Sequence, residues 1–240
     1  MPHEVRSEGL CVNYGKAVAV RNVNFVAPGG SVTGVVGPNG AGKSSLLLAL
    51  YGAVSATGIV SLDGQNVSRD SSSARVRQGI SIVPQGRQLF PRLSVTENLR
   101  VMAEFLKLPR SAVDEALDRF PILRSRARNL AGVLSGGEQQ MLVISRALMT
   151  APAVLLLDEM ATGLAPRIVV SLTDTIKGLA AEGVAVVYAA PEIGAVTESI
   201  DRGYVMIRGE LTESVENGGA ALDKMYRAAM GVEISESLEN

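Results

Sequence analysis

The sequence predicts an α/β fold in which helices cover a mainly parallel β-sheet. Along its 240 residues, short apolar segments rich in β-branched residues alternate with longer segments of helical periodicity. Strands that alternate with helices form parallel sheets, because each helix returns the chain to the same edge of the sheet. One long stretch, residues 85–150, has no strand pattern and predicts a helical insert.

The predicted strands are short, apolar and bounded by turn residues. Asp63-Gly64 ends one of them and Pro84 ends another, because neither a tight turn nor a proline continues a sheet ladder. The predicted strands are residues 32–36, 59–62, 79–83, 154–157, 184–188 and 203–207.

The predicted helices are recognised by apolar residues that share one face. Leu46, Leu47 and Leu50 do so directly after a glycine-rich turn. Within the insert, Ser94 and Glu97 form a capping-box pattern that opens a helix. The predicted helices are residues 44–51, 98–106, 112–120 and 168–181, with a last helix that docks on the core through Leu222, Met225, Tyr226 and Ala229.

The composition is that of a soluble globular protein, with 47% hydrophobic and 20% charged residues. The net charge of −1 does not favour a nucleic-acid partner. The single cysteine, Cys11, cannot form an internal disulfide, which favours a reducing compartment. No apolar run reaches the roughly 18 residues of a membrane helix, and residues 1–10 lack the apolar region of a secretory signal. We therefore expect any work at a membrane to be done through partners.

The strongest motif is a glycine-rich loop between the predicted strand 32–36 and the following helix. It runs Gly37-Pro38-Asn39-Gly40-Ala41-Gly42-Lys43-Ser44-Ser45 and fits the phosphate-binding loop pattern completely. Its glycines let the backbone turn N–H groups inward, where the helix N-terminus also favours a polyphosphate. Lys43 can neutralise the β- and γ-phosphates, and Ser44 can offer its hydroxyl to Mg²⁺. The alternative is a glycine-rich turn that carries lysine and serine by chance, which the flanking strand and helix disfavour.

Two carboxylates follow the predicted strand 154–157. Asp158 can hold Mg²⁺, and Glu159 can polarise the water that attacks a phosphate. The alternative is a solvated strand end without a function. Because the same chain has a phosphate loop, we favour a function for both carboxylates. We expect Lys43 and Glu159 to be catalytic residues, and Ser44 and Asp158 to be metal ligands.

A second candidate anion site lies in the segment Leu134-Ser135-Gly136-Gly137-Glu138-Gln139-Gln140. Ser135 can cap the helix that begins there, and the two glycines let a phosphate approach its N-terminus. One nucleotide needs only one such helix start. Two of them in one chain therefore predict that two chains share each nucleotide.

The phosphate loop, the Leu-Ser-Gly-Gly-Glu-Gln segment and the strand that ends in Asp-Glu, in this order, resemble the ATP-binding-cassette (ABC) ATPases over essentially the whole chain. The resemblance implies a P-loop NTPase (RecA-like) sheet with an N-terminal antiparallel β portion and an inserted helical subdomain. It implies ATP and Mg²⁺ as ligands and a head-to-tail dimer, in which Ser135, Gly137 and Glu138 act on the partner's nucleotide. We expect an ATP-binding core at residues 1–84 and 151–230, a helical insert at 85–150 and an acidic tail at 231–240.

Two more positions match the family one at a time. Tyr14 lies where the family stacks an aromatic ring on adenine, and the alternative is a tyrosine in the strand core. Gln85 lies where the family has a glutamine that contacts the metal and the attacking water and links the site to the helical insert. The alternative for Gln85 is an ordinary turn residue after Pro84.

The segment 85–99, with residues 129–132, 163–166 and 201–205, resembles the ATPases of high-affinity branched-chain amino-acid uptake. The chain is similar to the shorter of the two ATPases in such importers. These work with a second, different ATPase, two membrane permeases and an external solute-binding protein, which implies a place on the cytoplasmic face of the membrane. Urea and short-amide importers share much of this pattern, so they stay an alternative. Cassettes of DNA repair or the ribosome, and a regulatory cassette with little hydrolysis, are the other classes considered.

The sequence departs from the family after the predicted strand 184–188. The family usually has a histidine there that senses the γ-phosphate, but the only histidine of this chain is His3. An alignment without gaps places Pro191 at that position, and proline offers neither a side-chain donor nor a backbone N–H. Met160 and Ala165 are smaller departures, from a proline and an aspartate. We expect slow hydrolysis at the site built on Lys43, or hydrolysis only when a partner completes the site; the rival hypothesis is that another group replaces the histidine.

Overall fold

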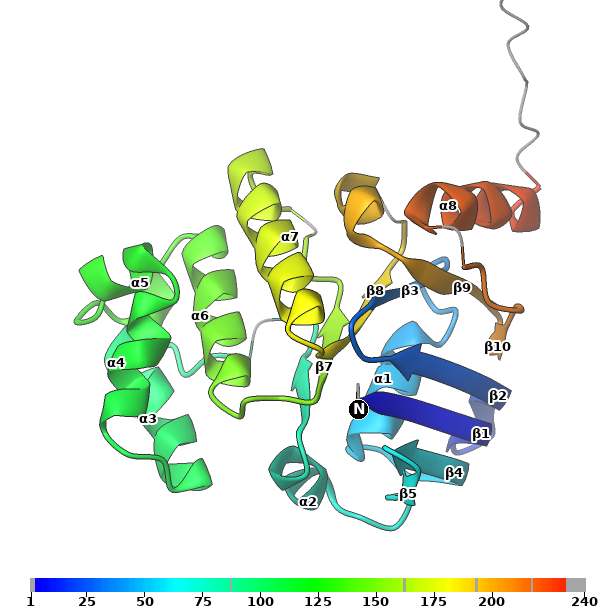
Figure 1. Cartoon of the computed structure of the whole chain (residues 1–240), viewed down its shortest axis with the longest axis horizontal. Coiled ribbons are helices and arrows are strands. Elements are labelled where there is room, and N and C mark those ends of the chain that lie inside the picture. Colours follow the sequence, from blue (N-terminus) through cyan, green and yellow to red (C-terminus); the bar gives the residue numbers. More distant parts are fainter. Residues whose placement is uncertain (1–2, 87, 162, 193, 217, 232–240) are drawn as a thin grey trace, which may run out of the picture.

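The structure, a computed structural model, describes residues 3–86, 88–161, 163–192, 194–216 and 218–231. Its strands form two sheets (Figure 1). The six-stranded sheet has the order β10-β9-β3-β8-β7-β6, and every strand pair in it is parallel except β9 with β10. Its strands are β3 (Val32–Val36), β6 (Ile80–Val83), β7 (Val154–Asp158), β8 (Ala185–Ala190), β9 (Arg202–Ile207) and β10 (Glu210–Leu211).

A second sheet is antiparallel and has the order β2-β1-β4-β5. It is built from β1 (Glu4–Tyr14), β2 (Ala17–Pro28), β4 (Ala56–Leu62) and β5 (Gln65–Asn66). The mainly parallel sheet and the N-terminal antiparallel portion are therefore both confirmed. The residue pattern alone did not reveal β1, because register shifts after Ser7 and Leu10 interrupt its alternation of buried and exposed residues.

The predicted strands are all present, with small differences at their ends. β4 begins three residues before the predicted start at Ile59, because Ala56 and Thr57 pair with β1 at Val12 and Cys11. β8 continues to Ala190, two residues past its predicted end, because its last residues pair with β3. Such pairing with a neighbouring strand overrides the weak strand propensity of alanine.

Helix α1 (Lys43–Tyr51) lies between the two sheets (Figure 1). Its Leu46, Leu47 and Leu50 are fully buried in one apolar cluster with residues of β1, β2, β3, β7 and β8. Parallel strands covered on both faces bury all their side chains, and β3 and β7 do so along their whole length. The helix that follows the glycine-rich loop is therefore held rigidly against the sheet.

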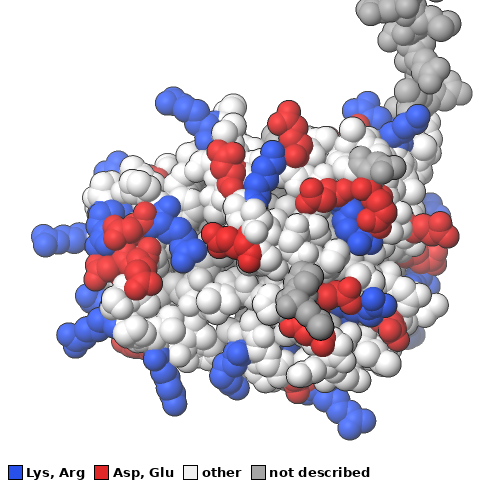
Figure 2. Space-filling view, in the orientation of Figure 1, with Lys and Arg blue, Asp and Glu red and all other residues white. Residues whose placement is uncertain are grey.

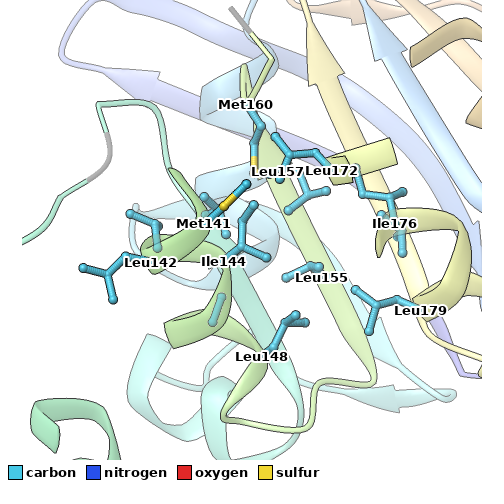
Figure 3. Packing of buried hydrophobic residues seen from close by; sticks show 14 of the residues in the cluster. Met141, Leu142, Ile144, Leu148, Leu155, Leu157, Met160, Leu172, Ile176 and Leu179 are labelled. Atoms are coloured by element: carbon cyan, nitrogen blue, oxygen red, sulfur yellow. The ribbon is translucent and has the colours of Figure 1, made fainter. Parts of the chain in front are cut away.

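The opposite face of the parallel sheet is covered by α6 (Gly136–Leu148) and α7 (Pro166–Ala181). Figure 3 shows Leu155 and Leu157 of β7 pointing to this face, between leucine and isoleucine side chains of the two helices. Fully burying such a side chain contributes about 1.5–3 kcal/mol. The strand β7, which leads into Asp158 and Glu159, is thus packed against α1 on one face and against α6 and α7 on the other.

The helices that precede α6 in the predicted insert lie together beyond it, on the left of Figure 1. They are α3 (Val95–Leu106), α4 (Ser111–Asp118), α5 (Pro121–Ser125) and the short 3-10 helix η1 (Ala131–Val133). The predicted capping box is present: Glu97 N donates to Ser94 Oγ at 3.2 Å, and Ser94 N donates to Glu97 Oε2 at 2.7 Å. The division into core, insert and tail stays a prediction, and residues 232–240 of the predicted tail lie outside the described residues.

The remaining helices are α2 (Ser72–Arg77), η2 (Gly194–Ser199) and α8 (Gly218–Ala229). In α8, Leu222 is fully buried and Met225 and Tyr226 pack against the core, as predicted, whereas Ala229 is exposed. Among the described residues, no helix is long and apolar enough to cross a membrane.

Candidate functional site

The glycine-rich loop has a backbone that only glycine adopts without strain. Gly40 and Gly42 have positive φ angles of 80° and 110°. Gly37 and Gly42 also leave no room for a side chain, because a Cβ would collide with the carbonyl oxygens of Met206 and Ala19 respectively. Asn39 at the loop tip is exposed, and Ser44 and Ser45 open α1. The loop therefore presents its backbone N–H groups at the N-terminus of α1, which is the arrangement that binds phosphates.

Lys43 is buried within this loop, with 4% of its surface exposed. Its Nζ donates to the carbonyl oxygens of Gly37 at 2.7 Å and Pro38 at 3.1 Å, and lies 4.0 Å from Glu159 Oε1. Burial lowers the pKa of Lys43, and the nearby Glu159 and Asp158 partly offset that effect. The lysine thus bridges the loop and the end of β7.

Asp158 ends β7 beside the start of α1. The hydroxyl of Ser44 and the backbone N–H of Gln85 both hydrogen-bond to its carboxylate, yet burial still raises its pKa above the ordinary value. Its Oδ1 is buried without a hydrogen-bond partner among the described residues. A buried carboxylate oxygen that lacks a donor, next to a serine hydroxyl, is a donor set that suits Mg²⁺. Asp158 and Ser44 therefore fit the predicted metal site.

Glu159 has an unusual backbone for a residue other than glycine, with φ of +51°. Its N–H donates to the carbonyl oxygen of Ala189 in β8 at 2.9 Å, which holds that conformation. Its Oε2 accepts a hydrogen bond of 2.7 Å from Gln85 Nε2, 74 residues away in the sequence. Such outliers cluster at functional sites. Gln85 is thus not an ordinary turn residue, since it contacts both carboxylates that end β7.

The second predicted anion site lies at the N-terminus of α6. Ser135 is the N-cap, accepting a hydrogen bond from Glu138 N at 3.3 Å, while Glu138 Oε2 accepts one of 2.7 Å from Ser135 N. Arg126 also contacts the Glu138 carboxylate, at 3.2 Å. Gly137 packs closely on Ile168, because a Cβ there would lie 2.9 Å from the isoleucine Cγ1. None of these hydrogen bonds reaches the phosphate loop of the same chain.

The remaining predicted residues differ in their placement. Tyr14, at the end of β1, is 50% exposed, which excludes the alternative of a strand-core residue and leaves its ring free to stack. Pro191 directly follows β8. His3 is paired with Asp63 through a contact of 2.8 Å at the antiparallel sheet, so it takes no part in this site.

Sequence reasoning missed the contribution of Ala189. It acts through its backbone carbonyl, which holds Glu159. Because every residue has a backbone carbonyl, the identity of the side chain at position 189 could not have predicted this contact. Asp158↔Ala189 is the last paired position of β7 and β8, and only the strand pairing reveals it.

Comparisons with known proteins agree with this geometry. A family model described as "ABC transporter" matches residues 20–162. The chain is 40% identical to the high-affinity branched-chain amino acid transport ATP-binding protein BraG of Pseudomonas aeruginosa, over 87% of this chain and 90% of that protein. It is 33% identical to the probable branched-chain amino acid transport ATP-binding protein LivF of Archaeoglobus fulgidus, over 84% of this chain and 88% of that protein.

A solved structure described as a dimeric bacterial ABC transporter cassette has a similar fold. It superposes with a TM-score of 0.80 and 25% identity, over 88% of this chain and 98% of that one. Both the family of the chain and its P-loop fold follow from these findings.

Proposed function

Because the chain belongs to the ABC transporter family of ATP-binding proteins, we propose that it is the ATP-hydrolysing subunit of an importer for branched-chain amino acids. The observation that carries this proposal is the convergence of Lys43, Glu159 and Gln85 at the end of β7. The similarity to BraG and LivF supports the amino-acid substrate over urea or short amides.

Binding of ATP begins at the loop and at the exposed ring of Tyr14. The phosphates enter the loop, where N–H groups and the α1 N-terminus stabilise their charge. Lys43 exchanges its two carbonyl partners for phosphate oxygens, whose negative charge favours the protonated amine. Tyr14 stacks on the adenine, and base–aromatic stacking contributes about 1–3 kcal/mol.

Hydrolysis requires a water held in line with the γ-phosphate. Ser44 and Asp158 would hold Mg²⁺, which when bound would supply positive charge against the phosphate oxygens. Glu159 polarises the water and accepts its proton, and Gln85 holds the carboxylate through the bond of 2.7 Å. The bond from Glu159 N to Ala189 O fixes the backbone from which this side chain extends.

A second chain completes the site. Ser135 and Gly137 stand at a separate helix start, and the capping bonds of Glu138 keep that start in shape. We propose that they face the γ-phosphate of ATP bound to a partner, in a head-to-tail dimer with a different ATPase chain. The dimeric cassette of similar fold supports such an assembly.

The end of β8 makes this chain's own site slow. Ala189, Ala190 and Pro191 offer no side-chain donor toward the γ-phosphate. Loss of one preorganised contact in a transition state costs about 10²–10³ in rate. The retained Glu159 argues against a site that is inactive altogether. Single-turnover hydrolysis in the assembled pair, with each site blocked in turn, tests this, and normal turnover at the Lys43 site would refute it.

The permease is proposed to dock where the insert meets the sheet. A groove of about 280 Å³ lies there between α1, β6, α3 and α6, lined by Tyr51, Ile82, Met102 and Arg146 among others. Phe90, Val101 and Phe105, close in sequence to the lining residues Gln88 and Met102, are exposed by 39–48%. Exposed apolar side chains around a groove are typical of protein interaction sites. We infer that residues 87–92, whose Gln88 lines this groove, form part of the contact with the permease. Arg87 lies outside the described residues.

We place the chain on the cytoplasmic face of the membrane, held there by the permease subunits and serving an external solute-binding protein. Figure 2 shows Lys and Arg side chains interspersed with Asp and Glu on the visible face, so that face offers no extended field of one sign. Together with the net charge of −1, this favours attachment through permeases over binding of anionic lipid.

The test of the proposed function is uptake in sealed vesicles that contain the chain with its permeases and second ATPase. We expect leucine-loaded solute-binding protein to stimulate ATP hydrolysis and to drive leucine inside. A complex that hydrolyses ATP and moves urea but not leucine would identify the alternative substrate. A complex without coupled uptake of any solute would favour a regulatory cassette.

A further inference from the structure

Asn98, in the first turn of α3, is a polar residue that is completely buried. Its Oδ1 accepts a hydrogen bond of 2.9 Å from Phe90 N. Its Nδ2 donates to the carbonyl oxygens of Phe90 at 3.0 Å, Leu93 at 3.2 Å and Ser94 at 3.0 Å. One amide therefore fastens three residues of the irregular segment 88–94 to α3. A buried amide that lost these partners would carry a full desolvation penalty.

The segment 88–94 borders the groove proposed for the permease. Arg146 of α6 donates from Nη2 to Gln88 O at 3.0 Å, and its guanidinium lies 5.9 Å from the centre of the Phe90 ring. Gln88 and Arg146 both line the groove, and the Phe90 side chain is 46% exposed. A partner seated in the groove would therefore press directly on this segment.

On its other side the same segment is bonded to η1, which leads directly into Ser135. Ala131 N donates to Leu93 O at 2.8 Å, and Gly132 N donates to Pro91 O at 2.9 Å. Gly132 allows this close approach, because a Cβ there would lie only 2.9 Å from the Pro91 oxygen. The segment thus lines the groove on one side and contacts η1 on the other, just before the helix start that is proposed to face the partner's ATP.

We propose that Asn98 is a positioning residue that makes residues 88–94 a rigid link. The link joins the groove proposed for the permease to the residues that lead from η1 into Ser135, called here the Ser135 loop. With the segment fastened, a displacement at Phe90 moves η1 and Ser135 together. With the segment released, the displacement is absorbed by local backbone rotation, and the Ser135 loop no longer responds. This inference rests on the proposed function, because it requires a permease in the groove.

A purely structural role for Asn98 makes a different prediction. It would lower stability and hydrolysis together, in proportion to the loss of folded protein. A positioning role would change the stimulation of hydrolysis without changing the basal rate. Basal hydrolysis uses Lys43, Gln85 and Glu159, and none of these bonds to Asn98. Only the stimulation of hydrolysis by the loaded solute-binding protein depends on the link.

The test uses Asn98→Asp in the complete transporter reconstituted in vesicles. The substitution keeps the shape of the side chain but replaces the N–H₂ donor with an oxygen that faces three carbonyls. We expect stimulation to fall about tenfold, the equivalent of about one buried hydrogen bond in the coupled state, with basal hydrolysis within about twofold of the native rate. The control is Thr96→Val, which removes the bond of 2.9 Å from Thr96 Oγ1 to Ala127 O in the same helical turn. It should leave stimulation unchanged.

Gly132→Ala provides a second variant should Asn98→Asp fail to fold, since Gly132 is exposed and lies at the far end of the link. It should reduce stimulation in the same way. Stimulation is first measured in the native complex: its absence there overturns the proposed function and this inference together. If the native complex is stimulated and either folded variant keeps that stimulation, the inference alone is wrong.

Discussion

The C-terminal ends of two neighbouring parallel strands, β7 and β8, carry very different side chains. β7 ends in Asp158 and Glu159, whose carboxylates are held by Ser44, Lys43 and Gln85. β8 ends in two alanines and is followed by Pro191, and its contribution is the backbone carbonyl of Ala189 that holds Glu159. The end of β7 thus carries the groups proposed to bind metal and activate water, whereas the residues at the end of β8 offer no side-chain donor. We therefore expect the chain to keep the groups needed for hydrolysis and to lack a side-chain contact from the end of β8 to the γ-phosphate.

Removing the base from the β7 end should have the largest effect. Glu159→Gln keeps the size of the side chain and the contact with Gln85 but removes proton acceptance, so we expect kcat for ATP to fall about 10²–10³-fold. ATP affinity should be retained or rise, and a dimer with bound ATP should accumulate. Rapid-quench hydrolysis and gel filtration measure these outcomes. Glu182→Gln, at the exposed C-terminus of α7, is the control. An unchanged rate in Glu159→Gln would favour a regulatory cassette.

Supplying the β8 end with a donor should have the opposite effect. We expect Pro191→His to raise single-turnover hydrolysis at this chain's site about tenfold, less than the 10²–10³ of a fully preorganised contact. Pro191→Ala serves as the control, because it relaxes the backbone without adding a donor. If the histidine variant is no faster than the alanine variant, another group already fills the role and the site is not slow.

Tyr14 lies away from both strand ends, so it should affect binding without affecting chemistry. Tyr14→Ala should weaken ATP binding about fivefold, in line with the loss of about 1 kcal/mol of stacking. Tyr14→Phe, which keeps the ring, should bind normally. Calorimetric titration measures the affinity, and a fall in kcat for Tyr14→Ala would show that the ring does more than hold the base.

Asp158 should show the smallest effect, on stability. Burial raises the pKa of Asp158 in the folded protein. Above that raised pKa the ionised carboxylate lowers the free energy of unfolding, and below the pKa of the unfolded state this loss of stability disappears. Asp158→Asn should therefore raise the melting temperature of the nucleotide-free protein at neutral pH, by about 2–4 °C for each kcal/mol gained. The gain should shrink as the pH falls through the raised pKa.

Calorimetry at neutral and acidic pH measures this gain. The control is Asp174→Asn on the exposed face of α7. Mg²⁺ should protect the native protein but not the Asp158→Asn variant. A melting temperature that falls in the variant would mean that the carboxylate stabilises the folded state and is not kept for metal binding.

The sequence by itself determined the features that depend on neighbouring residues. The glycine-rich loop, the caps formed by Ser94 and Ser135 and the carboxylates after β7 each involve residues within a few positions of one another. Turn and cap geometry follows from such local choices of residue, so the motifs could be read before any fold was known.

Only the tertiary structure decided what these motifs contact. The bond between Gln85 and Glu159 spans 74 residues and arises because β6 and β7 are neighbours in the sheet. The left-handed backbone of Glu159 depends on a carbonyl in β8, and the link through Asn98 depends on how α3 and η1 pack around residues 88–94. Contacts of this kind follow from strand order and packing, which no local pattern encodes. The sequence therefore located the chemical groups, and the fold brought them within hydrogen-bonding distance.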